Sequence, residues 1–161
     1  IRGQPLGIEP LRVADAIQNV LDDDIWAQTP ADPVAWAPYI RAQPLSGSAA
    51  NSVIVQFAKG DQTVPNPTAS ALVRSGGLED RATYFRNDLA FATVPGYTVK
   101  NPHTFLSNIS GASGPLAFAA QQQIATFLAS GGTTTIDPDG PGPYFETPIA
   151  GPLPEALNFL P

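Results

Sequence analysis

The feature that most constrains the fold is an apolar stretch from Ser52 to Ala58. Its residues do not alternate between polar and apolar, so a strand formed here would bury both of its faces. Such strands are typical of parallel sheets, which helices cover on both sides. A parallel sheet normally has several strands, and an apolar strand left unpaired is prone to aggregation. We therefore expect its far side to pair with a strand from a preceding part of the protein, a second polypeptide or another copy.

A second strand is expected shortly after the first. Residues 66–77 fit a helix, which Asn66 can cap and the pair Gly76-Gly77 can end. Residues 82–86 then fit a strand. Strand, helix and strand in this order form a βαβ unit with parallel strands and a right-handed crossover. The sequence therefore predicts an α/β fold.

The rest of the chain predicts helices and loops. Residues 10–26 and 115–129 place apolar side chains at helical spacing. Residues 32–40 fit a short helix with Asp32 as cap and Pro33 in its first turn, and a further helix is expected after His103. Residues 87–102 show no periodicity and are expected to form a functional loop. Residues 133–161 are rich in Pro and Gly and are expected to lie on the surface.

Composition excludes several functions. A chain of 161 residues with 43% hydrophobic residues is long enough for one core. The net charge of −6, with no basic run, argues against a nucleic-acid partner. No stretch is apolar for long enough to span a membrane. The absence of cysteine excludes disulfides and thiolate metal sites. Because the chain begins with Ile1 instead of Met, we expect it to be part of a longer protein.

The candidate functional residues come from the loops after the two strands. Asp61 lies three residues past Ala58, and His103, the only histidine, lies in the region that leaves the second strand. Reactive groups of open α/β sheets lie beyond the carboxyl ends of strands, and neighbouring strands are about 5 Å apart. We therefore expect an Asp61 oxygen within about 3.2 Å of a His103 ring nitrogen. A carboxylate that orients a histidine is part of a nucleophilic triad.

Two segments resemble motifs of the α/β-hydrolase family. Residues 59–65, Lys-Gly-Asp-Gln-Thr-Val-Pro, are similar to the family's Gly-Asp-x-x-Val-Pro acid turn, and Asn101-Pro102-His103 is similar to its histidine loop. The resemblance covers roughly residues 50–130 and is greatest to the C-terminal half of bacterial lipases and esterases. It implies ester hydrolysis, with Asp61 as triad acid and His103 as general base. It also favours a secreted or cell-envelope location, and it implies a lipid or small-molecule ester as substrate and no cofactor.

The chain departs from the family in one respect. It contains no Gly-x-Ser-x-Gly, and the nearest string, residues 111–115, follows the histidine instead of preceding the acid. The resemblance places the serine and the oxyanion hole in a preceding N-terminal part, so the chain alone should be inactive. Residues 1–45 would then be the end of a lid or cap, or a linker. Residues 46–132 would belong to the hydrolase core, and residues 133–161 would form the tail.

Other interpretations remain open. Asp88 is a rival acid, since it is nearer to His103 in sequence but lies beyond the last strand. The chain fits a non-catalytic binding or structural α/β domain as the alternative class, or a peptidase or amidase on the same scaffold. The run Asp22-Asp23-Asp24 fits a solvated turn better than a cation site.

A further acidic motif lies in the tail. Asp137, Asp139-Gly140 and Glu146 match the later part of an EF-hand loop, but Thr135 stands at the first ligand position and no helix follows. We expect no metal as part of the candidate catalytic site, and calcium in this stretch stays an open question.

Overall fold

A small mixed sheet forms the centre of the molecule. The computed structural model describes residues 8–160, with side chains from residue 13 onward. Strand β1 (Val55–Ala58) pairs in parallel with β2 (Ala82–Phe85), and β3 (Phe145–Glu146) pairs with β2 in the antiparallel direction. Together with the helices, the sheet makes the chain an α/β structure, as the sequence predicts.

Strand β1 is shorter than expected, because the neighbouring strand β2 begins only at Ala82, opposite Val55. The preceding residues, Glu79–Arg81, form a 3-10 turn (η2), so residues 52–54 have no neighbouring strand to pair with. The order β1-β2-β3 puts β1 at an edge of the sheet within the described part of the chain.

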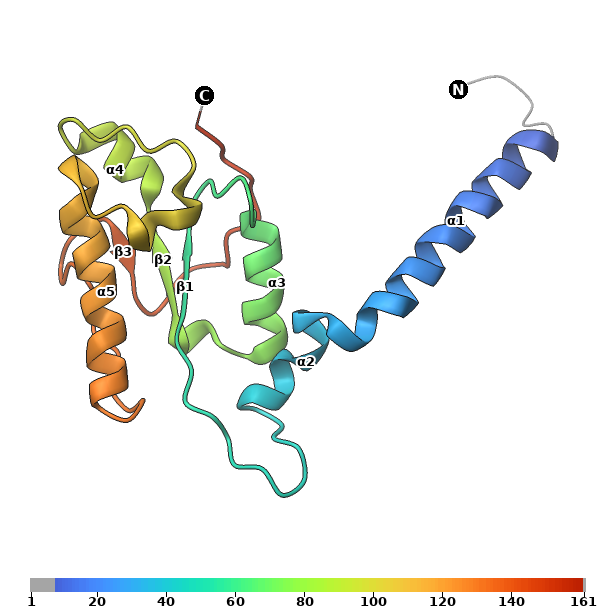
Figure 1. Ribbon diagram of the computed structural model, residues 1–161, viewed down its shortest axis with the longest axis horizontal. Helices are drawn as coiled ribbons and strands as arrows, with labels where there is room; N and C mark the ends of the chain where they lie inside the picture. The colour runs from blue at the N-terminus through green and yellow to red at the C-terminus, as the bar shows by residue number, and fades with distance from the viewer. Residues whose placement is uncertain (1–7, 161) are drawn as a thin grey trace.

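Helices cover both faces of the sheet, as the apolar pattern predicts. In Figure 1, α3 (Asn66–Gly76) and α5 (Gly114–Ala129) lie on opposite sides of the strands. Successive strand residues alternate between two cores. One core joins residues of the strands and α3, and the other joins the neighbouring strand residues and α5. The first contains Phe57, Val73, Leu78, Tyr84 and Ile149, and the second contains Ala58, Phe85, Phe105, Leu116, Ala120 and Phe145.

Helix α3 begins differently from the prediction. Pro65 is its N-cap residue, and Asn66 lies inside the first turn without a capping hydrogen bond. Asn66 is fully buried instead, and its Nδ2 donates to Tyr84 Oη at 3.2 Å and to the Ala156 carbonyl oxygen at 2.9 Å. The helix ends as predicted, at Gly77 in the left-handed region with φ +58°.

The region after β2 is more ordered than predicted. Helix α4 (Asn87–Thr93) begins directly after the strand, followed by the 3-10 segments η3 (Pro102–Ser107) and η4 (Gly111–Ser113). Asn87 is buried and accepts a hydrogen bond of 2.6 Å from the Tyr97 hydroxyl. The helix that we expected after His103 is η3, and it already includes the histidine.

The expectation that the tail lies only on the surface is wrong. Its residues form β3, and Phe145 and Ile149 are buried against the sheet. Farther along, the Ser70 hydroxyl of α3 donates to the Pro154 carbonyl oxygen at 2.6 Å, and Arg74 pairs with Glu155. The tail therefore completes one edge of the sheet and then follows α3.

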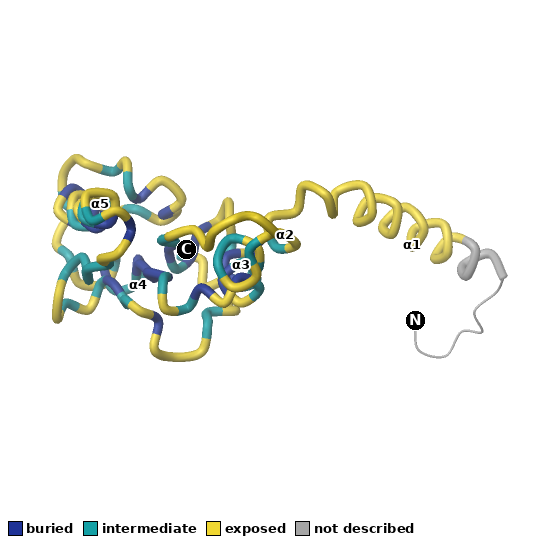
Figure 2. The backbone as a smooth tube through the Cα atoms, turned by 90° about the horizontal axis from the view of Figure 1, so that it is seen from below, coloured by how far each residue is buried: buried dark blue, intermediate teal, exposed yellow. Residues whose placement is uncertain are grey.

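The N-terminal helices differ in their packing. Helix α1 (Ile8–Gln28) extends away from the sheet (Figure 1), and Figure 2 colours its described length as exposed. The turn η1 (Thr29–Ala31) joins it to α2 (Pro33–Ile40), which packs against α3. Asp32 caps α2 as predicted, accepting from the Val34 N–H at 2.9 Å. In the part of the chain that the structure describes, no helix combines the length and apolar character needed to cross a membrane.

Candidate functional site

The acid side of the site is the turn after β1. Gly60 adopts φ +81°, and this lets the chain reverse directly after the strand. Asp61 is buried, and its Oδ1 accepts the backbone N–H groups of Thr63 at 2.7 Å and Val64 at 2.9 Å. The turn therefore fixes one carboxylate oxygen and leaves Oδ2 for another partner.

The histidine side comes from η3. His103 Nδ1 lies 3.0 Å from Asp61 Oδ2, and the His103 side chain is 40% exposed. The contact expected between these two residues is therefore present. Because Asp61 contacts Nδ1, the ring's Nε2 is directed away from the carboxylate. Among the described residues, no hydrogen bond to Nε2 occurs.

Asn101 connects the two loops. Its Oδ1 accepts the backbone N–H of Gln62 at 3.1 Å and that of His103 at 3.2 Å, and its Nδ2 lies 3.4 Å from Thr63 Oγ1. One side chain thus joins the acid turn to the start of the histidine segment. Sequence reasoning placed Asn101 only within the histidine motif. An Asn two residues before the histidine, in front of Pro102, was the available signal for this role.

A cavity of about 200 Å³ opens beside the pair. Asp61 and His103 line it together with Phe57, Val64 and Phe105. The side chains of Phe57, Val64 and Phe105 give the cavity apolar walls next to the partly exposed imidazole. A group placed here would meet an apolar surface and a proton acceptor together.

Asp88, the rival acid, is engaged elsewhere. Its carboxylate accepts from Arg86 Nε and Nη2, each at 3.0 Å, and lies 3.1 Å from Lys59 Nζ. Burial opposes ionisation of Asp88, but the hydrogen bonds from Arg86 and Lys59 outweigh it and lower the pKa of the carboxyl. Asp88 is therefore paired with Arg86 and Lys59 and does not contact the histidine.

The remaining candidates do not join the pair. The Ser113 hydroxyl donates to the Ser110 carbonyl oxygen at 2.8 Å at the start of α5. Asp22, Asp23 and Asp24 lie on the exposed helix α1, instead of forming the turn that we expected. Glu146 is paired with Arg86 at 2.8 Å. Within residues 13–160, no cluster of three or more His, Cys, Asp or Glu side chains is arranged to hold a metal ion.

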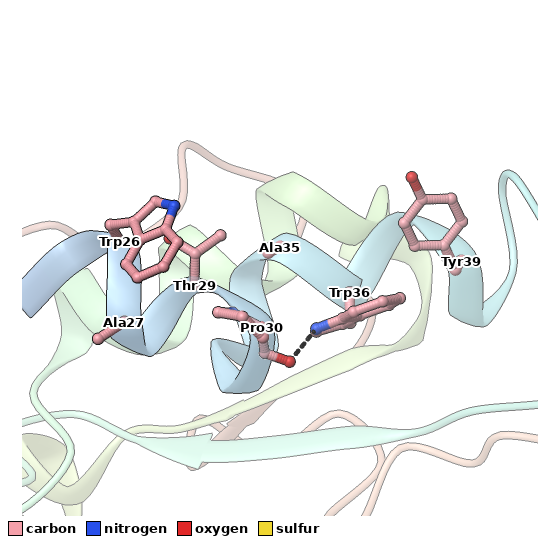
Figure 3. A pocket seen from close by; sticks show the side chains of 7 residues that line it. All are labelled: Trp26, Ala27, Thr29, Pro30, Ala35, Trp36 and Tyr39. Atoms are coloured by element: carbon pink, nitrogen blue, oxygen red, sulfur yellow. Dashed lines mark hydrogen bonds between the residues drawn. The ribbon is translucent and has the colours of Figure 1, made fainter.

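A larger cavity lies on the N-terminal helices. It has a volume of about 580 Å³, and its walls include the rings of Trp26, Trp36 and Tyr39 (Figure 3). The Trp36 Nε1–H donates to the Pro30 carbonyl oxygen at 2.8 Å, so its polar group is satisfied and an apolar face remains open. Among the described residues that line this cavity, Tyr39 is the only one with a titratable side chain.

Comparisons of the chain with protein-family models, with curated proteins and with solved structures gave no match. The fold and the geometry of the candidate site are therefore the only basis for classifying the chain. It is an α/β structure in which an aspartate and a histidine meet beyond the carboxyl ends of two parallel strands.

Proposed function

We propose that this chain supplies the acid and the base of a serine ester hydrolase, Asp61 and His103. The observation that carries the proposal is the 3.0 Å contact of Asp61 Oδ2 with His103 Nδ1, which leaves Nε2 for a nucleophile. The chain would form the C-terminal part of an α/β-hydrolase fold. Its substrate would be the carboxylic ester of a lipid or a small molecule, hydrolysed without a cofactor.

The mechanism assigns one role to each group. A serine hydroxyl placed in the cavity beside His103 would give its proton to Nε2 as its oxygen attacks the ester carbonyl. Asp61 would stabilise the imidazolium that forms, and the backbone donors on its Oδ1 would hold the carboxylate in place. His103 would then return the proton to the leaving alcohol, and water would release the acyl group by the same route.

The nucleophile and the oxyanion hole would come from another part of the protein. The chain contains no Gly-x-Ser-x-Gly, and family order puts this motif before the acid. The open edge of β1 is the place where the strands of that part would pair. Helices α1 and α2 would belong to a lid or cap, which would account for their exposed apolar side chains.

The test uses the longer polypeptide that includes the region before Ile1. We expect it to hydrolyse a short p-nitrophenyl ester, while the chain of 161 residues does not. In the longer protein, His103→Ala should lower kcat by about 10⁶-fold, because triad members act as a unit. Asp61→Asn should lower it by about 10⁴-fold, because the imidazole loses its orienting partner.

Asp88→Asn is the matched control. It removes the same charge from the first turn of α4 but leaves the contact between Asp61 and His103 intact. Its kcat should stay within a few fold of the wild type, with circular dichroism confirming that each variant is folded. If Asp61→Asn and His103→Ala keep full activity, the catalytic assignment is wrong.

A non-catalytic binding domain is the second candidate. The aromatic cavity between Trp26 and Tyr39 favours it, since large exposed apolar patches mark interaction sites. If the longer protein contains no Gly-x-Ser-x-Gly before Ile1, the binding function is supported over ester hydrolysis. Hydrolysis of peptide p-nitroanilides, measured beside that of p-nitrophenyl esters, would distinguish a peptidase or amidase from an esterase.

A further inference from the structure

We infer that residues 156–158 of the tail form a clasp on the acid turn, residues 60–65, and thereby position Asp61 and the ring of His103. For catalysis, this role rests on the proposed function, because the proposed hydrolysis uses these two side chains. The placement of the two side chains belongs to the chain of 161 residues itself and can be measured without a substrate.

The tail is bonded to the residue that follows the acid turn. Asn66 comes directly after Pro65 and is fully buried. Its Nδ2 donates to the Ala156 carbonyl oxygen at 2.9 Å and to Tyr84 Oη at 3.2 Å. The carbonyl oxygen can only accept, so the orientation of the amide is determined. One buried side chain therefore links the start of α3 to the tail and to β2, and such a bond is costly to leave unmade.

The tail also touches the residue that begins the acid turn. A Cβ on Gly60 would lie 2.8 Å from the Asn158 carbonyl oxygen, so the approach of the two backbones leaves no room for a side chain. Both residues are in the left-handed region, Gly60 with φ +81° and Asn158 with φ +47°. Asparagine tolerates this region better than most residues with a side chain do, whereas a β-branched residue is a rare outlier there.

The two contacts bracket Asp61. Gly60 comes directly before it, and Asn66 follows the last residue of the turn. The bonds from the Thr63 and Val64 N–H groups to Asp61 Oδ1 lie within the turn and hold the carboxylate relative to the turn itself. The clasp adds a contact at each end from a segment outside the turn. A movement of the turn away from the histidine therefore requires the tail to move as well.

The tail is held against α3 before it reaches the acid turn. The Ser70 hydroxyl donates to the Pro154 carbonyl oxygen, Arg74 pairs with Glu155, and Leu153 packs against the core beneath α3. None of these contacts involves the turn. A change among them can therefore serve as a control that disturbs the tail but leaves the clasp in place.

The test reads the tautomer of the only histidine by nitrogen-15 NMR of the chain of 161 residues. Asp61 Oδ2 contacts Nδ1, so the neutral ring should carry its proton on Nδ1. A ring without this partner should share the proton between its two nitrogens. Couplings from the carbon-bound ring protons report the tautomer even when the N–H proton exchanges rapidly. A loss of stability alone leaves this signal unchanged in the folded chain.

Asn158→Val is the principal variant. Asn158 is exposed, so the change removes no core packing, but valine opposes the left-handed backbone. We expect the preference for Nδ1 to be lost while circular dichroism stays that of the wild type. Asn158→Gly retains access to the left-handed region and should keep the wild-type tautomer. Glu155→Gln, the matched control on the same tail, breaks only the pair with Arg74 and should also behave as the wild type.

The same variants have an expected effect on catalysis. In the longer protein, Asn158→Val should lower kcat by about tenfold or more with little change in KM, because a misplaced base affects the chemical step. Asn158→Gly should retain most of the activity. A chain that stops at Glu155 is a second variant, since it lacks both contacts of the clasp. It keeps the test valid if the backbone accommodates valine at position 158.

Three results would overturn the clasp. A wild-type tautomer in both Asn158→Val and the chain that stops at Glu155 would mean that the acid turn holds Asp61 by itself. An equal change in Glu155→Gln would mean that any disturbance of the tail suffices. A wild-type ring without a preference for Nδ1 would mean that Asp61 does not orient it. If the tautomer responds as expected but the longer protein does not hydrolyse esters, the clasp is supported and the proposed function is wrong.

Discussion

Both oxygens of the Asp61 carboxylate are engaged at the candidate site. Oδ1 accepts two backbone N–H groups and Oδ2 contacts His103. The orientation of the imidazole thus depends on the backbone of the acid turn as well as on the carboxylate. Asn101 extends this dependence, because it ties the same turn to the backbone of the histidine.

A prediction at this scale concerns Asn101 as a positioning residue. In the longer protein, Asn101→Ala should lower kcat by about 10²-fold with little change in KM, because misplacement of the imidazole affects the chemical step. Asn101→Asp keeps the oxygen that accepts from Gln62 and His103, so it should restore most of the activity. If Asn101→Asp is as inactive as Asn101→Ala, the loss of kcat does not come from the hydrogen bonds that Asn101 Oδ1 accepts.

At the scale of elements, ion pairs join β2, α4 and β3 at one end of the sheet. Arg86 pairs with Asp88 and with Glu146, and Lys59 pairs with Asp88. These groups are only partly exposed, so solvent screens them less than it screens surface pairs. The network joins the start of α4 to β3 and to Lys59, which follows β1.

Asp88→Asn tests this network through pH. At neutral pH the variant should lose about 1–3 kcal/mol of unfolding free energy, as is typical for hydrogen bonds to charged groups. Because the folded-state pKa of Asp88 is lowered, its stabilisation is present above the unfolded-state pKa and is lost as pH falls through the folded-state pKa. Urea unfolding across an acidic series should show the difference from wild type shrinking below the ordinary value of 3.8. A difference that stays constant down to the lowest pH would contradict this.

The two-residue strand β3 also leads to a prediction. Phe145 is 3% exposed, and its ring centroid lies 5.1 Å from that of Phe85. Phe145→Ala should therefore lower the unfolding free energy by about 3–5 kcal/mol. Phe118→Ala is the control, since that ring is 55% exposed on α5, and its effect should stay within about 0.5 kcal/mol. If urea unfolding gives the same loss of unfolding free energy for Phe145→Ala and Phe118→Ala, the tail does not belong to the core.

The elements that the sequence predicts well are those with local signals. The apolar run before Asp61, the Gly77 terminus of α3 and the Asp32 cap of α2 each depend on neighbouring residues. The contact of Asp61 with His103 follows from the geometry of parallel strands. Strand β3 and the contact of Asn101 with Gln62 depend on segments far apart in sequence, whereas the local position of Asn101 before Pro102 indicates only its contact with His103.

At the scale of the whole molecule, apolar surface is unevenly distributed. Helix α1 exposes a row of aliphatic side chains together with Trp26, whose exposed fraction is 80%. The sheet, in contrast, is covered on both faces. If α1 belongs to a lid or cap, its apolar side chains would pack against residues outside this chain, which would explain why α1 is exposed while the sheet is covered.

Tryptophan fluorescence tests this division. In the chain of 161 residues, Trp26 should emit as a solvent-exposed indole and be readily quenched by acrylamide. In the longer protein, packing of α1 against the added residues should shift the emission to shorter wavelength and reduce quenching. Trp26→Phe should remove this change and leave the signal of Trp36. An identical spectrum in both proteins would mean that α1 stays exposed.

The last stretch of the tail passes directly over the acid turn. A Cβ on Gly60 would lie 2.8 Å from the Asn158 carbonyl oxygen, so the two backbones touch next to Asp61. The C-terminus is therefore a poor place for an affinity tag or a fusion partner. Bulk attached after Pro161 would pull on the segment that rests against the turn, whereas the N-terminal end of α1 is far from it in Figure 1. Purification handles placed at that opposite end would leave the aspartate undisturbed.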